Sequence, residues 1–127
     1  MKAVLVIEDL PDIRSWLVDT VRVAFPDAEV TAIGRCGDGI DALARQPFDV
    51  VLTDLELPDG SGVSVIRALR QQQPMALSVV VTIHDDDEHL FPALQAGAFG
   101  YLLKEASRQE LVAQLQRIAD GEPPLSP

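Results

Sequence analysis

The sequence has one cysteine, only 5% aromatic residues, half as many basic residues as acidic ones, and no long apolar run. A single cysteine, Cys36, cannot form an internal disulfide, which fits a reducing cytosol. The first apolar run, residues 4–7, is too short for a signal peptide and stops at the acidic pair Glu8-Asp9. No apolar stretch approaches the roughly 20 residues that a membrane-spanning helix needs. We therefore expect a cytoplasmic protein with no membrane partner.

The shortage of basic residues gives the chain a formal net charge of −10 at pH 7. A surface this acidic repels phosphate backbones, so we expect no DNA binding by the chain itself. If the full protein acts on DNA, another domain must make that contact. The 127 residues, of which 47% are hydrophobic, suit one globular domain that folds without disulfides.

Short apolar runs that do not alternate with polar residues predict a buried parallel sheet. These runs are residues 4–7, 50–52, 79–81 and 101–103. Strands covered by helices on both faces have this continuous apolar pattern. A fifth run, residues 30–33, is more polar, and we predict that it forms an edge strand.

Helical periodicity fills the gaps between the predicted strands. Apolar residues recur at helical spacing in five segments, which are Ile13, Leu17, Val21 and Phe25; Ile40, Leu43 and Ala44; Val63, Ile66 and Leu69; residues 90–95; and Leu111, Leu115 and Ile118. Gly97 and Gly121 are predicted to end helices, and Ser107 with Glu110 to form a capping box. The alternation of strands and helices predicts a doubly wound α/β fold, with a five-stranded parallel sheet in the order 2-1-3-4-5 between two layers of helices.

Polar side chains follow four of the predicted strands at the point where each strand ends. Glu8 and Asp9 follow the first strand, Asp54 ends the third, Thr82 the fourth, and Lys104 follows the fifth. The carboxyl ends of parallel strands share one edge of the sheet, where ligands bind. Three carboxylates repel one another there, and an oxygen ligand set without Cys or His favours Mg²⁺ over zinc. A magnesium site beside a lysine and a hydroxyl is suited to hold a phosphoryl group.

Over essentially its whole length, the chain resembles the receiver domain of bacterial two-component response regulators. The matching pieces are Glu8-Asp9, Asp54, residues 57–62 (LPDGSG), Thr82, residues 96–98 (AGA) and residues 101–104 (YLLK). The resemblance implies a flavodoxin-like, CheY-like fold that acts as a signalling switch and not as an enzyme. It also implies that Asp54 is the phospho-acceptor, with a sensor histidine kinase as the donor.

The same resemblance assigns the remaining site residues. Asp9 would be a direct Mg²⁺ ligand, Glu8 would act largely through water, and the backbone carbonyl of Glu56 would complete the metal site. Thr82 and Tyr101 would be the switch pair, and Lys104 the clamp on the phosphoryl group.

Residues 100–127 are similar to the NarL/FixJ-type group, whose receivers precede a helix-turn-helix DNA-binding domain. We therefore expect residues 1–121 to form the receiver and residues 122–127 (EPPLSP) to begin a linker to an output domain that this chain does not contain. DNA would be a partner only through that domain, and activation would allow two copies to associate as a homodimer.

Two positions depart from the family pattern. Many receivers have a proline after the lysine, with a cis bond, whereas Glu105 follows Lys104 here. A cis bond before a non-proline residue costs about 3 kcal/mol, so we expect a trans bond. Pro92 falls inside the fourth predicted helix, which either starts near Phe91 or is kinked.

Three alternative functions remain open at this point. A phosphatase of the haloacid dehalogenase type also uses an aspartyl phosphate, but carries its nucleophile on the first strand, and Asp54 is on the third. A flavodoxin-like cofactor-binding module needs a phosphate loop after the first strand, where this chain has acidic residues. A pseudo-receiver would act by protein contact alone, which the full set of site residues argues against.

Overall fold

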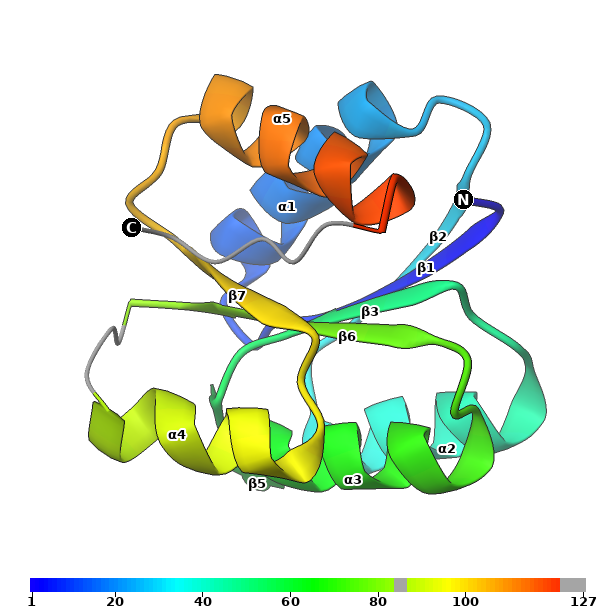
Figure 1. Ribbon diagram of the computed structural model, residues 1–127, viewed down its shortest axis with the longest axis vertical. Coiled ribbons are helices and arrows are strands. Elements are labelled where there is room, and N and C mark those ends of the chain that lie inside the picture. The colour runs from blue at the N-terminus through cyan, green and yellow to red at the C-terminus, as the bar shows by residue number, and fades with distance from the viewer. Residues whose placement is uncertain (84–86, 122–127) are drawn as a thin grey trace.

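The computed structural model describes residues 1–83 and 87–121. A parallel sheet lies at its centre, with the strand order β2-β1-β3-β6-β7 (Figure 1). The strands are β1 (Ala3–Ile7), β2 (Glu29–Ile33), β3 (Val50–Thr53), β6 (Leu77–Thr82) and β7 (Gly100–Leu103). Because β6 and β7 are the fourth and fifth strands of this sheet along the chain, the predicted order 2-1-3-4-5 is confirmed.

Helices cover both faces of the sheet (Figure 1). α1 (Pro11–Ala24) and α5 (Arg108–Ala119) lie on one face, and α2 (Cys36–Arg45), α3 (Gly62–Gln72) and α4 (Asp87–Ala96) on the other. The predicted three-layer, doubly wound fold is therefore confirmed. Within the described ranges, no helix has both the length and the apolar character that crossing a membrane requires.

The burial of β1 explains why its sequence does not alternate. Val4 and Val6 pack into the cluster beneath α1 and α5, whereas Leu5 and Ile7 pack into the cluster beneath α2 and α3. Successive side chains of a strand point to opposite faces, and here both faces are covered. β2, by contrast, lies at the edge of the sheet and is partly exposed, as its more polar sequence predicted.

Helix ends follow the local signals in the sequence. Pro11 occupies the first turn of α1, where the amide hydrogen that proline lacks has no partner within the helix anyway. The Ser107 side chain accepts a hydrogen bond from Glu110 N at 3.2 Å, which is one half of the predicted capping box. Gly97 and Gly121 both have positive φ, of 113° and 86°, and so end α4 and α5 in the left-handed conformation.

The structure excludes one of the two predicted arrangements of the fourth helix. α4 begins at Asp87, so a start near Phe91 is wrong, and Pro92 lies inside the helix. Proline cannot donate the hydrogen bond to the residue four positions earlier. The buried side chains of Leu90, Ala93 and Ala96 pack α4 against the sheet and stabilise it despite this loss. The Lys104–Glu105 bond is trans, as predicted.

A short hairpin that the sequence did not predict follows Asp54. It consists of β4 (Glu56–Leu57) and β5 (Gly60–Ser61), paired antiparallel. The predicted linker, residues 122–127, lies outside the described residues.

Candidate functional site

The backbone of the sheet fixes the starting points of the site residues. Glu8 N donates to Ile33 O at 2.9 Å, and Asp54 N donates to Ile7 O at 3.1 Å. Lys104 N donates to Thr82 O at 2.9 Å. Each bond extends a ladder one step beyond its strand, so three of the site residues are held by the sheet and not by a free loop.

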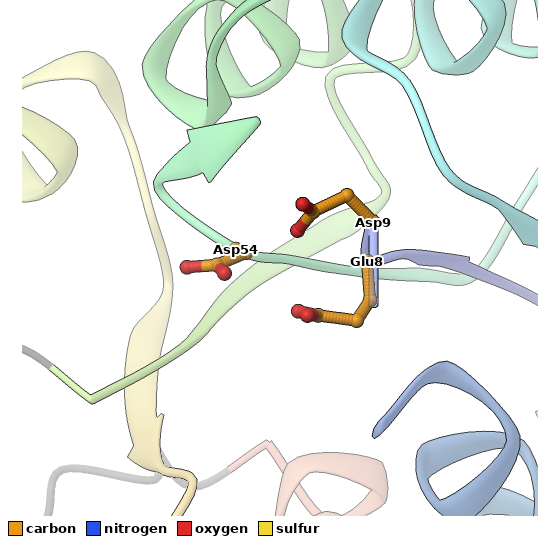
Figure 2. A group of neighbouring side chains, drawn as sticks. All are labelled: Glu8, Asp9 and Asp54. Carbon is orange, nitrogen blue, oxygen red and sulfur yellow. The ribbon is translucent and has the colours of Figure 1, made fainter. Parts of the chain in front are cut away.

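The three predicted carboxylates converge. One oxygen from each of Glu8, Asp9 and Asp54 lies within 4.8 Å of the other two, and Figure 2 shows the two side chains from the end of β1 reaching towards Asp54. Glu8 is fully buried, Asp54 is 8% exposed, and Asp9 is half-buried. Like charges this close repel strongly, so the group requires nearby positive charge.

Lys104 supplies one such charge. Its Nζ lies 2.7 Å from Asp54 Oδ2 and 2.8 Å from Glu8 Oε2. Burial by itself would lower the pKa of Lys104, but the contacts with Asp54 and Glu8 outweigh burial and raise it. Burial raises the pKa of Glu8, and Lys104 offsets only part of that rise. One ammonium thus serves two carboxylates and leaves the third without compensation from it.

The arrangement fits a hard divalent cation. Glu8 Oε2 is buried and, although paired in charge with Lys104, accepts no hydrogen bond of good geometry. A buried carboxylate oxygen in that condition has capacity for a further donor or cation. The converging atoms are all carboxylate oxygens, the ligand type that Mg²⁺ prefers. Asp9, Asp54, Glu56 and Lys104 also line an open pocket of about 610 Å³, which gives solutes access to the group.

The hairpin after Asp54 is held from two sides. Asp54 Oδ1 accepts a hydrogen bond from Leu55 N at 2.7 Å and a long one from Glu56 N at 3.5 Å. At its tip, the carboxylate of Asp59 accepts from Cys36 N at 2.7 Å and from Gly37 N at 2.9 Å. These two bonds lower the pKa of Asp59 and supply the cap that the first residues of α2 lack locally.

The predicted switch residues lie on neighbouring strands. Thr82 is fully buried at the end of β6, and Tyr101 is half-buried on β7. Tyr101 pairs in register with Val80, two residues before Thr82. Side chains two apart on a strand share a face, so Thr82 and Tyr101 lie on the same face of the sheet, the side covered by α4.

Sequence reasoning missed two side chains that hold this site. Asp59 entered the sequence prediction only as part of the motif in residues 57–62, and Arg14, whose side chain reaches the carbonyls of Glu8 and Asp9, was not considered. Asp59 binds backbone amides of a segment distant in sequence, and Arg14 binds backbone carbonyls across a turn. The spacing of residues in the sequence does not reveal contacts of either kind.

Comparison with known proteins gives this site its context. Residues 4–116 match the response regulator receiver domain family. The chain belongs to this family. The match sets aside the phosphatase and cofactor-binding alternatives, because the sequence pattern and the CheY-like fold agree. It also places the chain in a family of signalling domains and not among classical enzymes.

Relatives of the NarL type are prominent among the similar proteins. The DNA-binding transcriptional activator DevR/DosR of Mycobacterium tuberculosis is 32% identical over 124 residues, which are 95% of this chain and 56% of the relative. The nitrate/nitrite response regulator NarL of Escherichia coli K12 is 31% identical over 126 residues, covering 97% of this chain and 57% of the relative. The chain thus spans little more than half the length of these two proteins.

A solved structure with a similar fold carries the modification that the site suggests. It is a Burkholderia pseudomallei response regulator with a phosphorylated aspartic acid, a calcium ion and citrate. The TM-score is 0.81 at 26% identity, and the match covers 95% of this chain and 70% of that one.

Proposed function

We propose that this chain is a phosphorylation-activated switch that accepts a phosphoryl group on Asp54 from a sensor histidine kinase. The observation that carries the proposal is the convergence of three carboxylates around one lysine, at the pocket that Asp54 lines. The phosphorylated aspartate of the Burkholderia relative supports the same chemistry. In the transfer, an Asp54 oxygen bonds to phosphorus while the P–N bond of phosphohistidine breaks and its electron pair stays on the imidazole.

A carboxylate is a weak nucleophile, so the site must contribute position and positive charge, not a strong base. Asp9 and Asp54 would bind Mg²⁺ directly, Glu8 largely through water, and Glu56 through its backbone carbonyl. The bound ion would neutralise oxygens of the phosphoryl group. Lys104, already 2.7 Å from Asp54 Oδ2, would then pair with a phosphoryl oxygen as the clamp.

The output of the switch would pass through Thr82 and Tyr101. The Thr82 hydroxyl would move to bond the phosphoryl group, and Tyr101 would fill the vacated space. Because the two side chains share one face between β6, β7 and α4, such a movement would reshape the surface formed by α4, β7 and α5.

The whole protein is proposed to regulate transcription, as the name of its relative DevR/DosR, a DNA-binding transcriptional activator, states for that protein. Residues 1–121 would be the receiver, and residues 122–127 would begin the linker to a helix-turn-helix domain that binds DNA. Homodimer formation on activation and a cytoplasmic location belong to the same proposal.

The direct test is incubation with acetyl phosphate with and without Mg²⁺, followed by intact mass measurement and borohydride trapping of the modified residue. We expect one adduct, on Asp54, formed only with Mg²⁺ and absent in Asp54→Asn. An adduct on another residue, or one that persists in Asp54→Asn, refutes the assignment. No adduct in the wild-type protein would favour a pseudo-receiver.

A further inference from the structure

Arg14 on α1 reaches back to the turn that carries the acidic pair. Its Nη1 donates to Glu8 O at 2.9 Å and, more weakly, to Asp9 O at 3.4 Å. Its own backbone N donates to Leu10 O at 2.8 Å, so the helix that carries the side chain starts from the same turn. One guanidinium nitrogen therefore contacts the carbonyls of both acidic residues at the end of β1.

The space for this guanidinium depends on a glycine from another segment. A β-carbon on Gly34, just after β2, would lie 2.8 Å from Arg14 Nη1 and 3.7 Å from Glu8 O. The first distance is shorter than real β-carbon contacts. Gly34 therefore lets the guanidinium lie against the Glu8 carbonyl, enclosed by α1, the turn after β1 and the end of β2.

We propose that Arg14 is a positioning residue for the metal-binding carboxylates, and that Gly34 provides the space it requires. This inference rests on the proposed function of the site. The sheet holds Glu8 through its backbone N, but Asp9 lies one residue further along, in the turn. The two carbonyl contacts fix that turn, so the carboxylates of Glu8 and Asp9 stay directed towards Asp54.

The choice of carbonyls as acceptors matters for the chemistry. A second cation bonded to the carboxylates, in addition to Lys104, would compete with Mg²⁺ for the same oxygens. Arg14 instead places its charge behind the acidic pair, where it reduces the repulsion between the carboxylates and leaves their oxygens available. The planar guanidinium is also held in one orientation, which a flexible lysine ammonium is not.

The first experiment measures Mg²⁺ binding by titration calorimetry for wild-type protein, Arg14→Ala, Arg14→Lys and the control Arg22→Ala. Arg22 is an exposed basic residue in the last turn of the same helix. Loss of a residue that orients metal ligands typically weakens binding by about 10- to 100-fold. We expect a loss of about 10-fold for Arg14→Ala, a smaller one for Arg14→Lys, and no change for Arg22→Ala.

A double-mutant cycle tests the role of Gly34. Gly34→Ala should weaken Mg²⁺ binding through the displaced guanidinium, although Arg14 is still present. In the Arg14→Ala background the same substitution should have little effect, because the group it would clash with is gone. Equal effects of Gly34→Ala in both backgrounds would overturn the proposed coupling.

A readout without metal separates this inference from the proposed function. Amide hydrogen exchange at residues 8–10 should become faster in Arg14→Ala than in Arg22→Ala, with Mg²⁺ absent. If the wild-type protein fails to bind Mg²⁺, the proposed function fails while this measurement still tests the positioning. Unchanged exchange together with Mg²⁺ affinity within about 2-fold of wild type would show that Arg14 does not position the pair.

Discussion

Substitution of Gly62 by alanine should test how rigidly the backbone holds Asp54. Gly62 is the first residue of α3, and its N donates to Leu55 O at 2.9 Å. A β-carbon there would overlap the backbone O of Asp54, and would lie 3.0 Å from the carbonyl carbon and 3.1 Å from Leu55 Cα. Carbon atoms normally approach to about 3.5–4.0 Å, so the backbone must shift by roughly half an ångström or more.

The loss of stability caused by Gly62→Ala depends on the atoms that surround the clash. Overpacking typically costs about 1–3 kcal/mol, and the upper end applies because the obstructing atoms are backbone. Asp54 N donates a hydrogen bond to Ile7 O, which limits the movement that would relieve the overlap. Alanine gains at most about 1 kcal/mol in helix propensity over glycine, so the clash dominates. For 127 residues, the remaining cost of about 2 kcal/mol corresponds to a fall in Tm of roughly 7 °C.

Thermal unfolding followed by circular dichroism measures this effect, and Gly60→Ala is the matched control. A β-carbon on Gly60 would lie 3.4 Å from Cys36 Sγ, which is an ordinary contact, and Gly60 is in the same hairpin region. Gly62→Ala should also slow phosphorylation by acetyl phosphate, since the shift displaces Asp54 from Lys104. If the Tm values of the two variants agree within about 2 °C, the backbone at Asp54 can shift at little cost in stability, and the site is not held rigidly there.

Three further predictions concern the side chains of the site. Lys104→Ala should raise the pKa of Glu8 further above its ordinary value. Because the pKa of Glu8 is then higher in the folded state than in the unfolded state, stability should fall as pH rises through it, and a pH-independent Tm in the Ala variant would contradict the ion pairing. Lys104→Ala should also impair the response to phosphorylation more than Lys104→Arg. Asp59→Asn should lower Tm at neutral pH, and the difference from wild type should vanish as pH falls through the lowered folded-state pKa of Asp59; a difference that persists in acid would mean that charge is not the cause. Thr82→Ala should leave Asp54 phosphorylatable but reduce the NMR shift changes over α4, β7 and α5, and undiminished changes would refute the coupling.

The sheet was predictable because the burial of its strands requires continuous apolar sequence. β1 and β3 are covered on both faces, so every residue from Val4 to Ile7 had to be apolar, and the pattern could be read without any homologue. The edge position of β2 was predictable because a partly exposed strand tolerates the polar residues that its sequence contains. The convergence of Glu8, Asp9, Asp54 and Lys104 followed from topology, since the carboxyl ends of parallel strands must meet at one edge. The proposed roles of Glu56 and Tyr101 came only from the resemblance to receiver domains.

The hairpin and the start of α2 were not predictable by the same reasoning. Strands of two residues, such as β4 and β5, are too short to show a period. α2 begins at Cys36, but its N-cap residue, Arg35, makes no side-chain cap. The cap comes from Asp59, 23 residues after Cys36, and rules for local capping cannot detect a partner so distant in sequence.

The electrostatics of the site connect the structure to the proposed switch. Lys104 now serves both Asp54 and Glu8, and a phosphoryl group would replace one negative charge on Asp54 with about two. The ammonium would then be drawn towards the phosphoryl oxygens and away from Glu8, which is fully buried and whose carboxylate has no other ion pair among the described residues. The backbone N of Lys104 donates a hydrogen bond to Thr82 O. Any such displacement of Lys104 would therefore act on the backbone of the proposed switch residue. In the proposed function, the clamp and the switch would therefore be linked through β6 and β7, even before Thr82 itself bonds the phosphoryl group.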